Sequence, residues 1–206
     1  TLQKGRLGIG TTEPEGRLAV LDEPHNLEEF PPRAMTSNET YFEGHGVFKT
    51  SVSEYSGSAF HEGWNAFAHG AAEFWLMGDN AGYNLGSGEY EDNEFQLSSE
   101  TSMGQWIKLE MPYLTNVTKF ILKPRTPGAE YQAPKSGELW GSKDNYTWTK
   151  LHTFTDIQYY QGHTIFNFEN SGFYKYYGLV VTKVGGGSSI DYISIIDLRY
   201  FGTREQ

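Results

Sequence analysis

The sequence has no cysteine, few basic residues and no long apolar run. Without cysteine, the chain cannot be a disulfide-stapled miniprotein or bind zinc through thiolates. It has 16 Lys and Arg against 26 Asp and Glu, so the formal charge is −10. This charge opposes nucleic-acid binding, because phosphate contacts need clustered basic side chains. No stretch is long and uncharged enough to insert into a membrane.

Helical periodicity is also scarce, because Gly, Pro, Asn and Ser interrupt most windows of a dozen residues. Short alternating or β-branched runs are separated by turn residues, a pattern typical of an antiparallel sandwich or barrel. Aromatic residues form 16% of the chain, so large rings can supply much of the core. We predict an all-β fold, with one helical turn near residues 65–74. The expected strands are residues 107–111, 117–123, 138–140, 164–168, 174–181 and 193–200.

The first 26 residues differ in composition from the rest. Residues 5–14 are rich in Gly and Thr, and residues 22–26 are typical of a linker. A segment this short cannot bury a core of its own. We therefore divide the chain into a shaft-like or oligomerisation segment, residues 1–26, and a β-domain, residues 27–206. The Gly-Ile-Gly at residues 8–10 lacks the Lys-Ser/Thr and the helix of a phosphate-binding loop.

No catalytic motif is complete. His61 and Glu62 begin a zinc-protease motif, but the second His does not follow. There is no Gly-x-Ser-x-Gly elbow. The carboxylates between residues 89 and 94 are compatible with a cation site or a glycosidase pair, but also with a solvated acidic loop. We therefore expect a protein that is not an enzyme and requires no cofactor.

Aromatic residues beside polar ones in loop-rich stretches are the most informative set. A sugar presents an apolar face and a rim of hydroxyls, so its site combines a ring with hydrogen-bonding side chains. Arg125 ends a predicted strand, where its side chain can reach a pocket between strand-end loops. The alternative is that most of these rings pack in the core or in turns. The candidate ligand-binding residues are Trp64, His69, Trp75, Tyr83, Asn84, Arg125 and Tyr131.

From about residue 30 to residue 202 the chain resembles the discoidin family, also called coagulation factor 5/8 type C domains. The matching segments occur in the family's order. They are a Ser-rich strand (51–56), Asn-Ala-Phe…Gly…Trp (65–75), a Gln-Trp strand (104–109), a strand ending in Arg (117–125), a Tyr-rich strand (174–181) and a closing strand (193–202). The most specific segment is residues 139–148, in which Asn145 replaces the usual Gly. Asn is the next-best residue for a left-handed turn.

This resemblance implies a galactose-binding-like jelly roll, a β-sandwich of two antiparallel sheets whose loops at one end bind glycans, phospholipid headgroups or proteins. It also implies that Arg125 contacts sugar hydroxyls, as a matching Arg does in some members. Sugar-binding members often hold a structural calcium, and Asp197 matches an acidic position near that ion. However, Ala68 and His69 stand where the family's loop Asp belongs. The charge of −10 opposes the phospholipid alternative.

Residues 6–20 resemble a pattern found where shaft and head join in phage and large-virus fibre proteins. This implies a homo-oligomer such as a trimer, on a virion surface or otherwise outside the cell; a Gly-rich linker is the alternative. The sequence thus predicts a lectin-like attachment module that recognises host glycans, strengthened by multivalent display. Two alternatives stay open: a structural capsid, fibre or filament subunit, and an ancillary domain of a carbohydrate-active enzyme.

Overall fold

The computed structural model describes residues 27–70, 74–77, 80–125, 130–159, 162–187 and 192–205, together with the backbone of residues 2–3 and 6–7. The short strands β1 (Leu2–Gln3) and β2 (Arg6–Leu7) form an antiparallel pair. The other residues of the predicted segment 1–26 lie outside the described residues, so its role in assembly stays a prediction. In the part of the chain that is described, no helix has the length and apolar character to cross a membrane.

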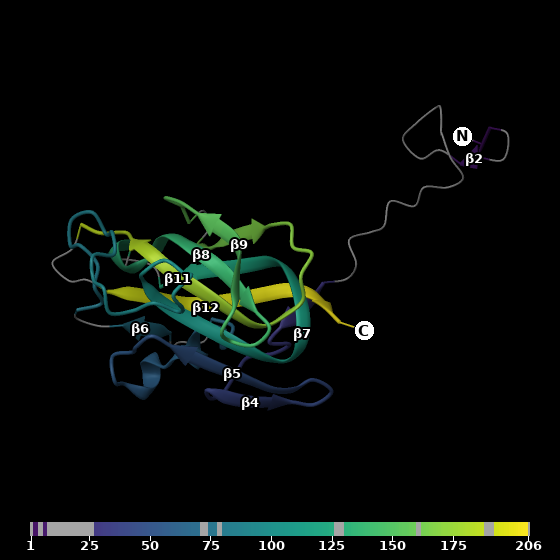
Figure 1. Cartoon of the computed structure of the whole chain (residues 1–206), viewed down its shortest axis with the longest axis horizontal. Helices are drawn as coiled ribbons and strands as arrows, with labels where there is room; N and C mark the ends of the chain where they lie inside the picture. The colour runs from purple at the N-terminus through teal and green to yellow at the C-terminus, as the bar shows by residue number, and fades with distance from the viewer. Residues whose placement is uncertain are drawn as a thin grey trace.

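The rest of the chain is all-β, as predicted, and its strands form a sandwich (Figure 1). β7 (Gln105–Pro124) is 20 residues long and belongs to both layers. Its first half pairs with β5 (Gly46–Val52) and β11 (Tyr174–Val184). Its second half pairs with β10 (Thr164–Asn167) and β12 (Ile193–Arg204). All of these pairs are antiparallel. Because its two halves pair with different strands, β7 connects the two sheets.

Shorter strands extend each layer. In the first, β4 (Glu39–Phe42) pairs with β5, and β8 (Pro134–Ser142) lies between β11 and β9 (Trp148–Phe154). In the second, β12 pairs with β6 (Trp75–Met77) and β3 (Glu28–Phe30) on the side away from β7. The predicted helical turn is the 3₁₀ segment η2. The 3₁₀ segments are η1 (Ala59–His61), η2 (Gly63–Phe67) and η3 (Glu130–Gln132).

Large rings fill the space between the layers. Trp75, Tyr177 and Tyr200 are fully buried, and Phe120 stacks on Phe166 with ring centroids 4.4 Å apart. Each ring of this kind removes about 150–250 Å² from water. The aromatic content of the sequence is therefore largely a property of the core.

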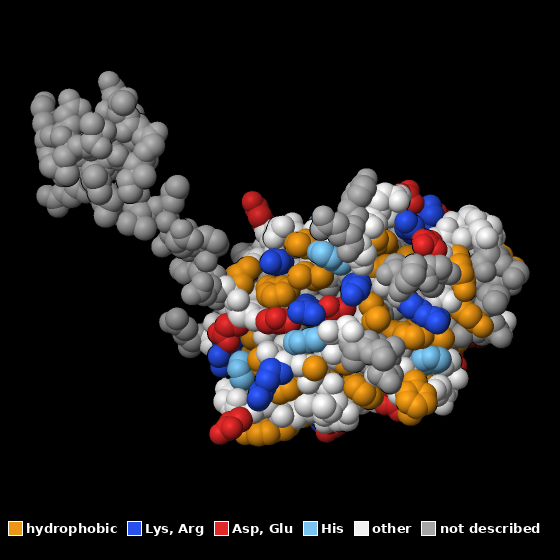
Figure 2. All heavy atoms as spheres, turned by 180° about the vertical axis from the view of Figure 1, so that it is seen from behind, with side chains coloured by type: hydrophobic (Ala, Val, Ile, Leu, Met, Phe, Trp, Pro, Cys, Tyr) orange, Lys and Arg blue, Asp and Glu red, His pale blue; other side chains and the backbone are white. Residues whose placement is uncertain are grey.

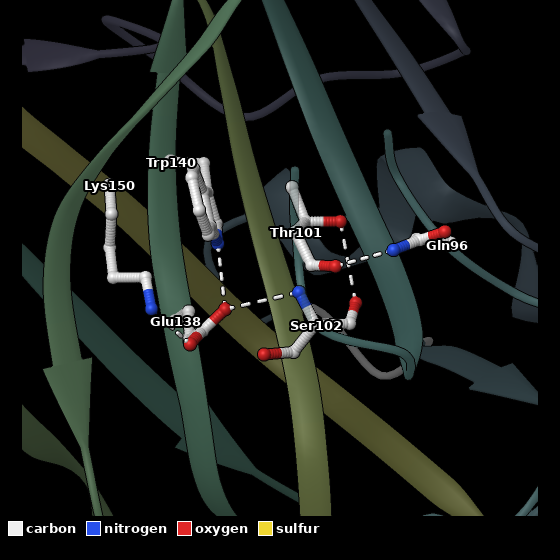
Figure 3. A network of polar contacts seen from close by, with 6 residues as sticks. All are labelled: Gln96, Thr101, Ser102, Glu138, Trp140 and Lys150. Atoms are coloured by element: carbon white, nitrogen blue, oxygen red, sulfur yellow. Dashed lines mark hydrogen bonds and ion pairs between the residues drawn. The ribbon is translucent and has the colours of Figure 1, made fainter. Parts of the chain in front are cut away.

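A second apolar cluster lies on the outer face of β8, β9 and β11, where the side chain of Leu97 packs against it. Glu138 joins the loop that carries Leu97 and Ser102 to the sheet, and we call this loop the outer loop (Figure 3). Its Oε2 accepts hydrogen bonds from Trp140 Nε1 at 3.0 Å and from the backbone N–H of Ser102 at 3.4 Å. Its Oε1 pairs with Lys150 Nζ at 2.6 Å. This network attaches the outer loop to β8.

Several loops gather at one end of the sandwich, opposite the C-terminus (Figure 1). The strand registers show this, because Val184 at the end of β11 faces Pro134 at the start of β8. Pro124 at the end of β7 faces Ile195 near the start of β12, and Ile195 also faces Trp75 of β6. The loops next to these strand ends therefore share one surface.

Candidate functional site at the strand-end loops

An aromatic ring contacts two basic side chains at this end. Because Ile195 pairs with β6 on one side and β7 on the other, Phe74 before β6 and Arg125 after β7 come close together. The Arg125 guanidinium lies 4.6 Å from the centroid of the Phe74 ring. The His61 ring lies 5.0 Å from the same ring, centroid to centroid. We call His61, Phe74 and Arg125 the strand-end cluster.

The loop before the cluster fixes the place of His61. Ser58 caps η1 by accepting a hydrogen bond from the backbone N–H of Phe60 at 3.3 Å. Ser56 Oγ lies 2.6 Å from His61 Nδ1, and the backbone N–H of Ser56 donates to the carbonyl of Leu76 in β6. Phe60 is 65% exposed, which is unusual for a large apolar ring. The loop thus presents an exposed ring next to an oriented imidazole.

The cluster combines one fixed positive charge, on Arg125, with a neutral imidazole. Burial, and then the positive charge of Arg125, lower the pKa of His61, so its ring is neutral at pH 7. Arg125 is exposed and forms no ion pair with the other described residues. Its guanidinium carries five N–H donors in a fixed plane. Rings beside such donors match a ligand with an apolar face and a rim of hydroxyls.

Two predicted ligand-binding residues belong to the core instead. Trp75 is fully buried and its Nε1 donates to the Glu54 carbonyl at 3.0 Å. Tyr83 is 4% exposed and its hydroxyl donates to the Val181 carbonyl at 2.9 Å. Burial raises the pKa of the Tyr83 hydroxyl. A ring without an exposed face cannot pack on a sugar from solution, so the structure corrects the prediction at both positions.

Asn84 and Tyr131 lie in loops beside the end of β11. Asn84 Oδ1 accepts hydrogen bonds from the backbone N–H groups of Gly86 and Ser87, both at 2.9 Å, so its side chain shapes its own turn. The Tyr131 carbonyl accepts from the backbone N–H of Gly186 at 3.2 Å. These contacts give both residues a role in loop structure, and ligand binding by them stays a prediction.

Trp64 and His69 have partners elsewhere. Trp64 is half-buried, and its Nε1 donates to Glu62 Oε2 at 2.9 Å. His69 has a left-handed backbone (φ 56°), and its Nε2 lies 3.2 Å from Glu29 Oε1 in β3. Of the seven candidates, Arg125 is the one in the strand-end cluster. Phe74 was not among the predicted residues, and His61 was considered only as a possible zinc ligand.

The described residues do not fit the calcium that the resemblance implies. Asp197 is buried and its carboxylate is bound by Arg199, with Nε at 2.9 and 3.0 Å from the two oxygens. Calcium takes six to eight oxygen ligands. Among the described residues, no group of three or more His, Asp and Glu could hold a metal ion. In the acidic loop, Glu89 pairs with Lys183 at 3.1 Å.

No protein-family model and no curated protein matches this sequence. Solved structures do match, and three examples, each covering three quarters or more of the chain, show the degree of similarity. Chitosan-binding module 1 from a chitosanase/glucanase of Paenibacillus sp. IK-5 has 18% identity and a TM-score of 0.54, over 80% of this chain and 96% of the module. CpGH89CBM32-5 from Clostridium perfringens, in complex with GalNAc-β-1,3-galactose, has 18% identity and a TM-score of 0.53, over 75% and 95%.

The third is the family 32 carbohydrate-binding module of C. perfringens NanJ in complex with galactose. It has 12% identity and a TM-score of 0.50, over 75% of this chain and 93% of the module. Identities this low establish the fold alone. The chain therefore has the galactose-binding-like β-sandwich fold of family 32 carbohydrate-binding modules, as the sequence predicted.

Proposed function

We propose that this chain is a non-catalytic glycan-binding module and that the strand-end cluster is its site. The observation that carries the proposal is the contact of the Phe74 ring with both Arg125, at 4.6 Å, and His61, at 5.0 Å. Supporting it, structures with the same fold were solved with galactose, GalNAc-β-1,3-galactose and chitotriose. These three sugars are therefore the first probes.

In this proposal the C–H face of one sugar ring packs on the exposed ring of Phe60 or on the half-buried ring of Phe74. Arg125 and the neutral His61 exchange hydrogen bonds with the sugar hydroxyls. Each such bond replaces one to water, so its net contribution is about 0.5–1.5 kcal/mol. A single shallow site is accordingly weak, and several copies displayed together raise the effective concentration of sites.

The surface supports a neutral ligand in preference to a polyanion. Figure 2 shows acidic and basic side chains interspersed with apolar atoms on the face it displays, without a continuous basic patch. The whole chain carries −10. Nucleic acids and anionic membranes would be repelled by that charge. We place the module outside the cell, where it meets glycans.

Calorimetric titration with the three probe sugars tests the site. Arg125→Ala and Phe74→Ala should each weaken binding about tenfold or more, because each removes one half of the recognition surface. Arg33→Ala is the matched control, since Arg33 also lies over a ring, 5.7 Å from the centroid of Phe42 beside the β4–β5 turn. Unchanged affinity in both site variants, or no binding of any glycan by the wild type, would count against the proposal.

The module can belong to either of two kinds of protein, which differ in oligomeric state. The resemblance of residues 6–20 supports the head of a viral or phage fibre that attaches to host glycans. In contrast, neighbours in fold include modules of a chitosanase/glucanase and of a family 31 glycoside hydrolase, which supports an ancillary domain of an enzyme. Light scattering of the chain with and without residues 1–26 separates them. A trimer that becomes a monomer supports the fibre head, and a monomer in both supports the ancillary domain.

A further inference from the structure

A second hollow lies on the outer face of the first layer. It spans β7 between the β4–β5 hairpin and β11, encloses about 260 Å³ and shares no residue with the strand-end cluster. Small-molecule sites range upward from roughly 300 Å³, so this cavity is sized for about one sugar ring. Its lining includes Lys49, Lys108, Glu110, Asn145 and Tyr176.

Strand register explains how these side chains meet. Lys49 of β5 faces Glu110 of β7, and Glu110 faces Tyr176 of β11. Alternation along β7 then places Lys108 on the same outward face as Glu110. Asn145 reaches the cavity from the β8–β9 turn, where its left-handed conformation (φ 66°) directs its side chain to Lys108. Four separate elements, β5, β7, β11 and the β8–β9 turn, thus build one cavity.

The cavity has one positive charge that its acidic neighbours do not neutralise. Lys49 pairs with Glu39 at 3.0 Å, and Lys175 pairs with Glu110 at 2.9 Å. Lys108 Nζ instead donates to the neutral amide oxygen of Asn145 at 2.8 Å, and it forms no ion pair within the described chain. Burial lowers the pKa of Lys108, and the nearby Glu110 opposes that shift only in part. A bound anion would relieve this cost, since an opposite charge stabilises a partly desolvated cation.

We propose that this cavity is a second binding site, for a sugar that carries a carboxylate, such as a uronic acid. The carboxylate pairs with Lys108, and Asn145 orients the ammonium toward it. The Tyr176 ring offers an apolar surface for the face of the pyranose. The site distinguishes acidic from neutral sugars by charge, because a neutral sugar leaves the positive charge of Lys108 without an anionic partner.

Galacturonic acid and galactose are matched probes, since they differ in a carboxylate at C6. Ser51 also lines the cavity. Titrated into ¹⁵N-labelled protein, galacturonic acid should shift the signals of Ser51 and of the Asn145 side chain, and galactose should not. Lys108→Met should weaken galacturonic acid binding about tenfold or more, because it removes a charge-assisted hydrogen bond. Lys143→Met in the same turn as Asn145 removes an equal charge and should have little effect. By linkage, galacturonic acid should also raise the pKa of Lys108 in the wild type.

Glu110→Gln keeps the shape of the cavity and removes its negative charge, so it should tighten galacturonic acid binding even if Lys108→Met folds poorly. The proposal is overturned if galacturonic acid does not bind, or if it shifts only the strand-end cluster and is lost in Arg125→Ala. Loss of galactose binding in Arg125→Ala tests the first site alone. Failure of one proposal is therefore distinguishable from failure of the other.

Discussion

Replacing Glu138 tests how the outer loop is attached to the first sheet. Glu138 is 7% exposed and accepts from Trp140 Nε1, from the backbone N–H of Ser102 and from Lys150. Glu138→Ala removes all three acceptor contacts at once. Glu138→Gln is the matched control, because its amide oxygen can still accept from Trp140 while the negative charge is lost.

The cost can be worked out contact by contact. Trp140 is buried, so an unsatisfied indole N–H costs about 1–3 kcal/mol. The Ser102 bond is long at 3.4 Å and contributes about 0.5 kcal/mol. The Lys150 side chain is 46% exposed and returns to water, so its pairing contributes under about 1 kcal/mol. We expect Glu138→Ala to destabilise the fold by about 2–4 kcal/mol, which for a domain of this size lowers the melting temperature by about 5–15 °C.

Denaturant unfolding followed by tryptophan fluorescence measures the loss, and Glu138→Gln should cost about 1 kcal/mol. Burial raises the pKa of Glu138, but hydrogen bonds from Lys150, Ser102 and Trp140 outweigh it and leave the pKa below its ordinary value of 4.5. The carboxylate is thus more acidic in the folded state, so its contribution to stability is complete above pH 4.5 and is lost as the pH falls through the lowered pKa. An alanine variant within about 0.5 kcal/mol of wild type, or two variants of equal cost, would show that the hydrogen bonds of Glu138 do not hold the loop to β8.

Two further predictions concern other positions. Gly88 has φ 74°, and a Cβ there would lie 2.2 Å from the Val184 carbonyl oxygen. Gly88→Ala should therefore destabilise the fold by about 3 kcal/mol or more. A melting temperature equal to that of the wild type would contradict this expectation. Arg125→Ala should raise the pKa of His61 partway toward 6.5, because the positive charge is the smaller of its two causes after burial. An NMR titration of the His61 ring checks this, and an unchanged pKa would show that Arg125 does not act on it.

Local sequence rules predicted the turns and much of the sheet. Asn145 was expected in a left-handed turn, and its φ of 66° confirms this. The strands expected at residues 107–111 and 117–123 form the single strand β7, which continues through Pro112. The last strand also continues past Gly202, where a Cβ would lie 2.0 Å from the Asn116 carbonyl oxygen. Close packing against β7 therefore explains this glycine.

The site was harder to predict because it is built from distant segments. The strand pairs of β12 bring Phe74 and Arg125 together across 50 residues of chain, and no short motif reports such a contact. The prediction that Trp75 and Tyr83 bind a ligand was wrong for a related reason. Both have a polar atom that suits a ligand, but the same atom bonds a backbone carbonyl when the ring points inward. Sequence alone does not give the direction of a ring in a loop-rich stretch.

Glycan binding at the strand-end cluster can be tested directly by NMR titration of the ¹⁵N-labelled chain with galactose, GalNAc-β-1,3-galactose and chitotriose. If the strand-end cluster is a glycan site, at least one of these sugars will shift the signals of His61, Phe74 and Arg125 in a saturable way. In Arg125→Ala those shifts will need about tenfold or more sugar to saturate, and the remaining spectrum will be unchanged. Saturable shifts confined to another surface, or no shifts with any of the three sugars, would show that the strand-end cluster is not a glycan site.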